Sequence, residues 1–233
     1  MQDLKKNEQF ELEILDKLNS GRFLTYLVFG GGTMLRLCYG LDRYSVDLDF
    51  WVVKKINFNK LFSDLKTYIG QFYTLTDTAN KFYTILLEVK SPNYPRALKI
   101  EIRKEIRKIK TASAIAYSPD ANIQVLLKVV ALSEMMRAKI EAFLNRKEIR
   151  DVYDIEFLIK KGVDIETSPE NLNALLKEIE NLTQKDYTVK LGSLLEPIQR
   201  KYYKSENFKI LTFKIKEMLS EKSSKAVGKY AEY

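Results

Sequence analysis

Two short groups of residues near the start of the chain have the types and the spacing that phosphate and metal chemistry require. Gly30-Gly31-Gly32-Thr33 follows an apolar segment, and Asp47-Leu48-Asp49 opens the apolar run FWVV. Glycines let the backbone approach a ligand closely, and the start of a following helix offers unpaired N–H groups and a positive dipole end to an anion. A tight strand-to-helix turn without a ligand would explain the same glycines.

The two aspartates favour a magnesium site. In a β-strand, residues i and i+2 face the same side, so Asp47 and Asp49 point together while Leu48 packs inward. Adjacent carboxylates repel each other unless a cation lies between them, and Mg²⁺ prefers carboxylate oxygens combined with substrate phosphates. The Thr33 hydroxyl would then donate to a phosphate oxygen. The alternative is an exposed strand edge with two incidental acidic residues.

Composition excludes several classes of enzyme. The 233 residues include no histidine and one cysteine, Cys38. A Ser-His-Asp triad, a histidine-ligated zinc and a disulfide framework are therefore excluded, and the chemistry must use carboxylates, lysine, hydroxyls or a hard metal ion. We find no apolar stretch long enough to span a membrane and no apolar core of a signal peptide, so we expect a cytoplasmic protein without membrane contact.

The elements that must position these residues indicate an α+β fold in two parts. The first part, 1–118, is expected to form a mixed or antiparallel sheet with flanking helices. Its expected strands are 23–29, 47–53, 71–76, 82–89 and 97–103, and its expected helices are 4–19, 33–39 and 57–69. The second part, 119–233, shows only helical patterns and is expected to form a helical bundle. Its expected helices are 120–144, 149–161, 169–182, 186–204 and 207–222.

Glu101 and Lys128 are further candidates. In the strand 97–103, Glu101 lies on the polar face and could join the aspartates across neighbouring strands, or form an ion pair with a basic residue of an adjacent strand. Lys128 is the one charged residue in IQVLLKVVAL. Such a lysine either extends to the surface or points at a negative ligand.

The charge is uneven along the chain, with a formal net value of +8. Segments 96–110 and 198–230 are strongly basic, whereas 151–187 is acidic. This separation suits a polyanionic partner such as nucleic acid, or it is the solvated surface of a lysine-rich protein.

A Gly-Gly-Thr turn followed by Gly-x-x-Arg-x-Ser-x-Asp-Leu-Asp-Phe resembles the nucleotidyltransferases of the DNA polymerase β superfamily, and most closely the AbiEii/AbiGii-type toxin family. The matching residues are Gly31, Gly32, Thr33, Gly40, Arg43, Ser45, Asp47, Leu48, Asp49 and Phe50. The segment 145–158 resembles that family's Arg-Asp-x-Tyr-Asp-Leu helix, and 127–132 resembles its lysine-bearing helix. The resemblance covers about residues 24–162.

The resemblance implies a role for each matched residue. Gly31, Gly32 and Thr33 would hold a nucleoside triphosphate, and the aspartates, with Glu101 as third acid, would bind Mg²⁺. Lys128 would contact the phosphates. Asp151 would complete the site from the helical part, with Arg150 paired to it. Ordinary surface pairs Lys147–Asp151 and Arg150–Asp154 would explain the same charges, and Tyr153 and Ile155 are expected in the core. Arg36, Arg43 and Ser45 are expected to support the loop before the acid pair.

The resemblance also implies the reaction, in which two Mg²⁺ ions assist transfer of a nucleoside monophosphate from an NTP to RNA. A tRNA 3′ end is the expected acceptor, and an antitoxin encoded nearby is the expected partner. Two alternatives remain. One is a nucleotidyltransferase that modifies protein hydroxyls, and the other is an inactive nucleic-acid-binding protein with the same fold.

Overall fold

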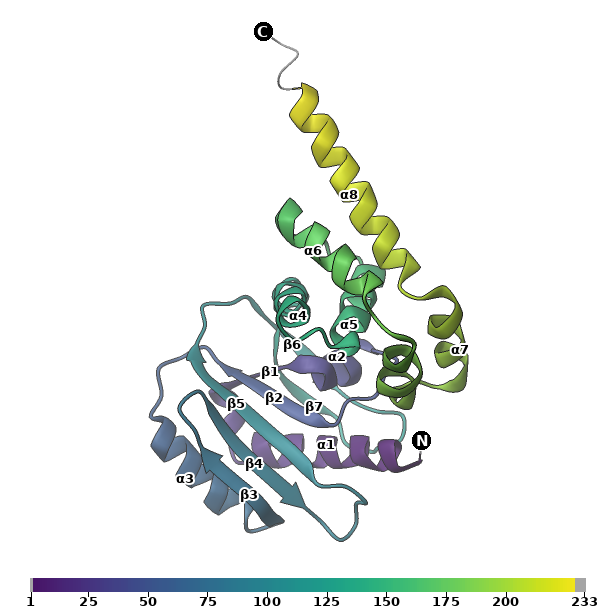
Figure 1. The fold of residues 1–233 in the computed structure, drawn as a ribbon. Helices are drawn as coiled ribbons and strands as arrows, with labels where there is room; N and C mark the ends of the chain where they lie inside the picture. Colours follow the sequence, from purple (N-terminus) through teal and green to yellow (C-terminus); the bar gives the residue numbers. More distant parts are fainter. Residues whose placement is uncertain (1, 229–233) are drawn as a thin grey trace. The chain divides into compact units, whose positions relative to one another are not determined.

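The computed structural model describes the backbone of residues 2–228 and the side chains of residues 2–221. The chain divides into two compact units, Met1–Ala131 and Leu132–Tyr233. The first is an α/β unit and the second is helical, as the α+β fold class requires (Figure 1). The division falls later than position 118 because the chain between 120 and 130 adds a strand to the sheet of the first unit.

A seven-stranded mixed sheet forms the centre of the first unit. Its strand order is β3-β4-β5-β2-β1-β7-β6. The strands are β1 (Leu27–Gly30), β2 (Asp47–Val52), β3 (Thr74–Asn80), β4 (Thr84–Lys90), β5 (Leu98–Ile106), β6 (Thr111–Ala116) and β7 (Val125–Val130). The pairs β2/β5 and β1/β7 are parallel, and the other neighbours are antiparallel.

Strand β5 has one buried face and one partly exposed face. On β5, Leu98, Ile100 and Ile102 are fully buried, whereas the side chains that alternate with them keep contact with solvent. The helices α1 (Gln2–Ser20) and α3 (Phe58–Ile69) pack against the sheet, and α2 (Gly31–Tyr39) follows β1 directly (Figure 1). On β5, alternation therefore separates core side chains on one face from polar side chains on the other, whereas the central strand β1 is buried on both faces.

The expected helix 120–144 is wrong in its first part. Val125, Leu127 and Val129 are buried and alternate with the exposed Leu126 and Lys128, which is the two-residue period of a strand. This segment pairs with β6, a strand that the sequence analysis missed. The lysine expected on a helix therefore lies on β7, and the helix α4 begins after it, at Leu132–Arg146.

The second unit contains short helices around its own core. They are α4, α5 (Ile149–Lys160), α6 (Pro169–Glu180), α7 (Pro197–Glu206) and α8 (Lys209–Gly228), with a π-helical turn at Asp186–Leu191 and a 3₁₀ turn at Gly192–Leu194. The expected helix 186–204 is thus divided. Glu196 is extended, with φ −63° and ψ 155°, because the residue before a proline disfavours the helical conformation, and Pro197 then opens α7. Within the described part of the chain, we find no helix that is long and apolar enough to cross a membrane.

Candidate active site

The acid pair opens β2 on the partly exposed face of the sheet. Asp47 and Asp49 are partly exposed and Leu48 between them is fully buried, as the alternation of a strand predicts. In the antiparallel register with β1, Asp49 lies opposite Gly30. The turn that ends β1 and the acid pair are therefore neighbours across two strands.

Gly31 lies directly against the carboxylate of Asp49. Its φ is +74°, a left-handed conformation that side chains other than glycine rarely adopt. A Cβ atom at Gly31 would lie 2.2 Å from Oδ2 of Asp49, closer than any van der Waals contact allows. At Gly32, a Cβ atom would lie 2.5 Å from the guanidinium of Arg43. Gly31 is thus required by its left-handed backbone and by the close approach of the turn to Asp49, whereas a side chain at Gly32 would have to displace the Arg43 guanidinium.

Thr33 joins the same turn to β2. Its side chain is fully buried, and its hydroxyl donates a hydrogen bond of 2.6 Å to the backbone carbonyl of Asp47. The sequence analysis expected this hydroxyl to face a phosphate, whereas in this structure it holds the first residue of β2 in place. This bond is a second direct connection between the start of α2 and the acid pair.

Two arginines support the loop between α2 and β2. Arg43 is buried and donates to the backbone carbonyl of Tyr44 (3.0 Å). Arg36 donates to the carbonyl of Leu41 (3.1 Å), pairs with Glu8 (2.9 Å) and lies 3.8 Å from the centre of the Tyr44 ring. These contacts agree with the expected supporting role of both arginines.

The sequence analysis missed two acidic residues of α1, one of which, Glu8, pairs with the loop-supporting Arg36. Glu8 and Glu11 are buried, and Oε2 of Glu11 has no hydrogen-bond partner within the described part of the protein. Burial, and then the charge of Glu8, raises the pKa of Glu11 well above its ordinary value, and the charge of Asp47 acts in the same direction. A signal was present, because both acids continue the helical spacing of Leu4 and Leu15 on the buried side of α1.

Glu101 lies beside the acid pair. In the parallel register of β2 and β5 it is opposite Asp49, and on its other side it is opposite Leu86 of β4. Neither of these directly opposite residues is basic. No three acidic or cysteine side chains converge into a complete metal site within the described residues. Glu101 is therefore a neighbour of Asp49 in the sheet, without a preformed three-carboxylate cage within the described residues.

Lys128 points to the same face of the sheet as Asp49. Val129, Phe29 and Phe50 lie side by side across β7, β1 and β2 and are fully buried, so the residues that precede Val129 and Phe50 turn to the opposite face. Lys128 is exposed there. Because β1 lies between β7 and β2, the two strands are about 10 Å apart, at roughly 4.8 Å per strand spacing.

Asp151 belongs to a buried ionic cluster inside the helical unit. Its fully buried carboxylate accepts two hydrogen bonds of 2.7 Å from Arg146 and one of 3.2 Å from Lys139. Lys139 also pairs with the fully buried Asp154 at 2.6 Å. The negative charges of the two aspartates are thus compensated by the positive charges of Lys139 and Arg146.

These contacts correct the expected pairing around Asp151. Its cationic partners are Arg146 and Lys139, whereas Arg150 is exposed, and Lys147 pairs with Glu178 at 3.1 Å. Asp151 and Asp154 are buried instead of lying on exposed helix faces, because α4 and α5 pack against each other at these positions.

The core positions expected for Tyr153 and Ile155 are confirmed. Lys139 was missed, although its spacing places it on the buried face of α4 with Met135, Ile140 and Phe143.

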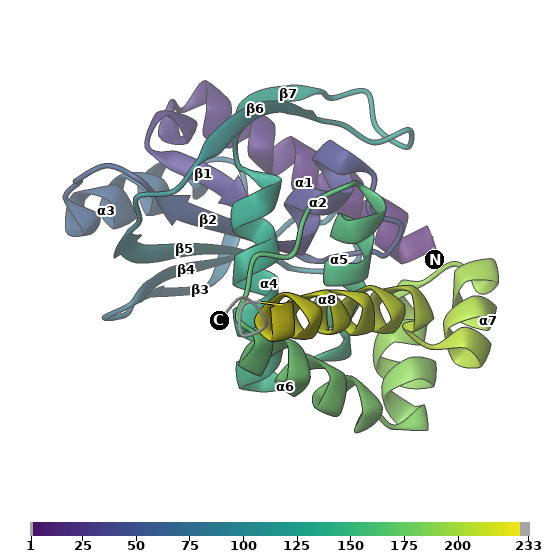
Figure 2. The same cartoon turned by 90° about the horizontal axis from the view of Figure 1, so that it is seen from above.

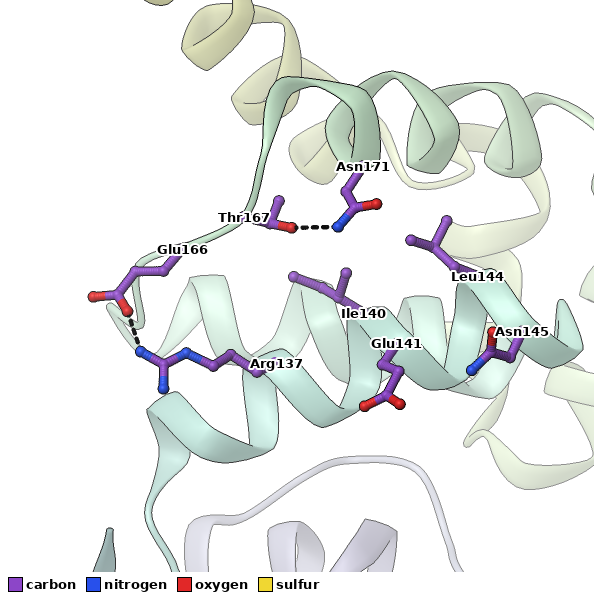
Figure 3. Close-up of a pocket in the computed structure, with 8 residues that line it drawn as sticks. All are labelled: Arg137, Ile140, Glu141, Leu144, Asn145, Glu166, Thr167 and Asn171. Carbon is purple, nitrogen blue, oxygen red and sulfur yellow. Dashed lines mark hydrogen bonds and ion pairs between the residues drawn. The ribbon is translucent and has the colours of Figure 1, made fainter. Parts of the chain in front are cut away.

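A cavity of about 360 Å³ opens between α4 and the segment that leads into α6 (Figure 3). Arg137 forms an ion pair with Glu166 at one end, and Asn171 donates to the Thr167 hydroxyl (3.0 Å). The lining residues are Arg137, Ile140, Glu141, Leu144, Asn145, Glu166, Thr167 and Asn171. This lining includes no residue that the sequence analysis assigned to the site.

The fold is shared with a solved structure from Helicobacter pylori. The crystal structure of JHP933 from Helicobacter pylori matches with a TM-score of 0.54 and 23% identity, over 96% of this chain and 98% of that one. MenT4, a nucleotidyltransferase toxin from Mycobacterium tuberculosis, matches with a TM-score of 0.49 and 14% identity, over 91% of this chain and 94% of that one. A comparison with curated proteins gave no match.

Comparison with family models is more specific. The model described as "Nucleotidyl transferase AbiEii toxin, Type IV TA system" matches residues 13–223, which include the glycine turn, the acid pair and the cluster around Asp151. The family expected from the three sequence motifs is therefore confirmed. The chain belongs to the AbiEii family of nucleotidyltransferase toxins of type IV toxin–antitoxin systems.

Proposed function

We propose that this protein transfers a nucleoside monophosphate from an NTP to an RNA hydroxyl, with a tRNA 3′ end as the acceptor and Asp47 and Asp49 as the metal-binding pair. In this reaction the acceptor oxygen bonds to the α-phosphorus, and the bond between the α-phosphorus and pyrophosphate breaks. The observation that carries the proposal is the packing of the Gly31 turn against the Asp49 carboxylate, which brings an anion-binding helix start and a cation-binding pair together.

The donor set around Asp49 fits magnesium. Asp47, Asp49 and Glu101 offer only carboxylate oxygens from one face of two neighbouring strands. Mg²⁺ is commonly held by one or two carboxylates together with substrate phosphates, so a site that the protein leaves incomplete suits it. When bound, Mg²⁺ supplies Lewis-acid stabilisation of the charge on the attacking and leaving oxygens. This chemistry requires no histidine, and the chain has none.

The residues of the α/β unit have separate roles in this proposal. The backbone N–H groups at the start of α2 bind the triphosphate beside Gly31 and Gly32. Thr33 fixes the backbone of Asp47 through its buried hydroxyl, and so acts on the metal-binding residue as well as at the phosphate turn. Lys128 is exposed on the same face as Asp49 and offers a cation to the nucleotide phosphates.

Asp151 acts as a positioning residue in the helical unit. Both oxygens of its buried carboxylate already accept hydrogen bonds from cationic side chains. Its task in our proposal is to hold Arg146, whose side chain is 47% exposed, in one orientation. A half-exposed guanidinium fixed in this way presents donors suited to a phosphate.

The basic segment 96–110 supports an RNA acceptor, and the family description supports an antitoxin as partner. The direct test is to incubate the protein with each α-³²P-labelled NTP, Mg²⁺ and total RNA, and then to separate RNA from protein. We expect label in tRNA-sized RNA with one or more NTPs, and no transfer after chelation of the metal. Label in the protein fraction alone would identify a protein-modifying enzyme and overturn the RNA assignment.

A matched pair of variants tests the acid pair. Asp49→Asn keeps the size of the side chain and removes one of the charges that hold the cation, so we expect transfer to fall by orders of magnitude. Asp77→Asn, on β3 of the same sheet, removes an exposed charge away from the site and is expected to leave transfer unchanged. Normal turnover by folded Asp49→Asn protein would contradict the proposed role.

A further inference from the structure

The hairpin that joins β3 and β4 exposes two adjacent aromatic rings. Phe82 is 83% exposed and Tyr83 is 76% exposed. Their ring centres are 4.6 Å apart with an interplanar angle of 82°, an edge-to-face pair. Large apolar side chains that stay together in solvent mark a surface for a partner more often than isolated ones do.

The hairpin is held in place by β5. The backbone N–H of Lys81 donates to the carbonyl of Thr84 (2.9 Å) and closes the turn. The backbone N–H of Lys104 donates to the carbonyl of Tyr83 (2.9 Å), and the Lys104 ammonium donates to the carbonyl of Lys81. The two rings therefore project from a braced turn, which lowers the entropy cost of binding a ligand on them.

Two other segments lie at this end of the sheet, one around residues 51–60 and one at the end of β5. The backbone N–H of Arg107 donates to the carbonyl of Val52 (3.0 Å), and Asn80 donates to the side chain of Asn59 (2.8 Å) at the start of α3. Figures 1 and 2 show the β3–β4 hairpin, the end of β5 and α3 at the same end of the sheet. We call this region, formed by residues 51–60, 80–84 and 103–108, the hairpin end.

The hairpin end is strongly basic. Its cationic residues are Lys54, Lys55, Lys60, Lys81, Arg103, Lys104, Arg107 and Lys108. Its acidic residue, Glu105, is paired with Arg107 at 2.6 Å, and Lys60 is paired with Asp64 of α3 at 3.0 Å. A surface of this composition attracts a polyanion and repels basic partners.

Aromatic rings are interleaved with these cations. The Lys104 ammonium lies 5.9 Å from the centre of the Phe58 ring, and the Arg107 guanidinium lies 4.9 Å from the Trp51 ring. Proteins that bind single-stranded nucleic acid combine cations that follow the backbone with exposed rings on which bases stack. A folded protein partner would need a strongly acidic surface to match these cations, whereas every single-stranded nucleic acid supplies both phosphates and bases.

We propose that the hairpin end binds a single-stranded stretch of nucleic acid, with unpaired bases stacked on Phe82 and Tyr83 and the phosphates held by the surrounding lysines and arginines. The surface leads toward the acid pair, because Arg103 lies two residues after Glu101 on β5 and Glu101 lies opposite Asp49. Delivery of an acceptor end to Asp49 rests on the proposed function, whereas binding at the hairpin end does not.

Ring removal tests the stacking. The affinity of the full chain for a fluorescein-labelled 12-nucleotide single-stranded RNA is measured by anisotropy, without NTP or Mg²⁺. We expect Phe82→Ala/Tyr83→Ala to weaken binding at least about five-fold, since one lost stack is worth roughly 1–3 kcal/mol. Phe82→Tyr/Tyr83→Phe keeps both rings and is expected to bind normally. Phe213→Ala, which removes a 70% exposed ring of α8, is the matched control and is expected to have no effect.

Salt dependence separates stacking from charge. Each phosphate contact on a single strand contributes a slope of about 0.7 to the dependence of log K on log salt. Lys54→Ala/Lys55→Ala/Lys108→Ala should therefore reduce the slope by about 2, whereas the ring-removed variant should keep the wild-type slope. A 5-bromouridine oligonucleotide irradiated on the protein should crosslink to the peptide that contains Tyr83.

Several outcomes would overturn this inference. They are an unchanged affinity after ring removal, an equal loss in the ring-preserving variant, or equal binding of duplex and single strand with no effect of the rings. Asp49→Asn protein should bind the oligonucleotide normally, so a failure of the proposed reaction would leave this result unaffected. If ring removal leaves RNA binding intact but abolishes binding of purified antitoxin, the hairpin is a protein-binding surface instead.

Discussion

Gly31 and Asp49 are separated by less space than one methyl group needs, since a Cβ atom at Gly31 would lie 2.2 Å from Oδ2 of Asp49. The glycine turn and the acid pair are therefore one mechanical unit. A side chain added at Gly31 would push against the Asp49 carboxylate. A larger side chain at position 49 would in turn push against the backbone of the glycine turn. Gly31 is therefore needed for two reasons, its left-handed backbone conformation and the space that the Asp49 carboxylate occupies beside it.

Gly31→Ala should therefore cost more than backbone strain. Gly40 provides the control, because its φ is +76° and a Cβ atom there would meet nothing within 4 Å. Both alanine variants should lose about 1–2 kcal/mol of stability from the left-handed conformation. Only Gly31→Ala should also lose nucleotidyl transfer, because it displaces Asp49. Equal activity of the two variants would show that the clash is relieved without moving the carboxylate.

Thr33→Val distinguishes a positioning role from a phosphate-binding role. The substitution keeps the shape and removes the donor to the Asp47 carbonyl, which should lower the free energy of unfolding by about 1–3 kcal/mol. Thr33→Ser should retain most of the stability. Urea unfolding and NTP titration are measured on both variants. A Thr33→Val protein with normal stability but weaker NTP binding would instead favour a direct contact with phosphate.

Glu11 should make the protein less stable as pH rises. Its pKa is raised by burial and by Glu8, so the folded protein keeps the proton above pH 4.5, the ordinary value, while the unfolded chain ionises. In that interval the folded state binds more protons, and the free energy of unfolding falls with increasing pH. Glu11→Gln should therefore stabilise the protein more at pH 8 than at pH 4.5. The exposed Glu141→Gln should change stability little at either pH.

Lys139→Met should destabilise the helical unit strongly. It leaves Asp151 and Asp154 buried with one cation fewer, and removal of one partner of a buried pair costs about 3–5 kcal/mol. Lys147→Met removes a lysine whose pair with Glu178 is partly exposed, and it should cost about 1 kcal/mol or less. Adding Asp154→Leu to Lys139→Met should recover part of the loss. If the two lysine variants unfold alike in urea, the cluster does not contribute as its burial implies.

The local signals in the sequence were sufficient for much of the α/β unit. The alternation in Asp47-Leu48-Asp49 and in β5 predicted which side chains turn toward solvent, since the period of a strand is a local property. The family was also readable from three motifs and their order along the chain, and the family comparison confirms it. The segment around Lys128 failed because its apolar run is consistent with either a buried strand or a helix, and only pairing with β6 decides between them.

The partners of charged side chains were decided by the tertiary structure. The i,i+4 spacing suggested an ion pair between Lys147 and Asp151. In the structure, α4 packs on α5 and Asp151 forms its ion pairs with Lys139 and Arg146. The reason is physical, because a buried carboxylate must find its cations among whatever side chains enclose it, at any sequence separation. The amino-acid sequence alone thus determined the faces of the strands, the glycine turn and the acid pair. The contact of Gly31 with Asp49 and the engagement of the Thr33 hydroxyl depend on strands and helices brought together by folding.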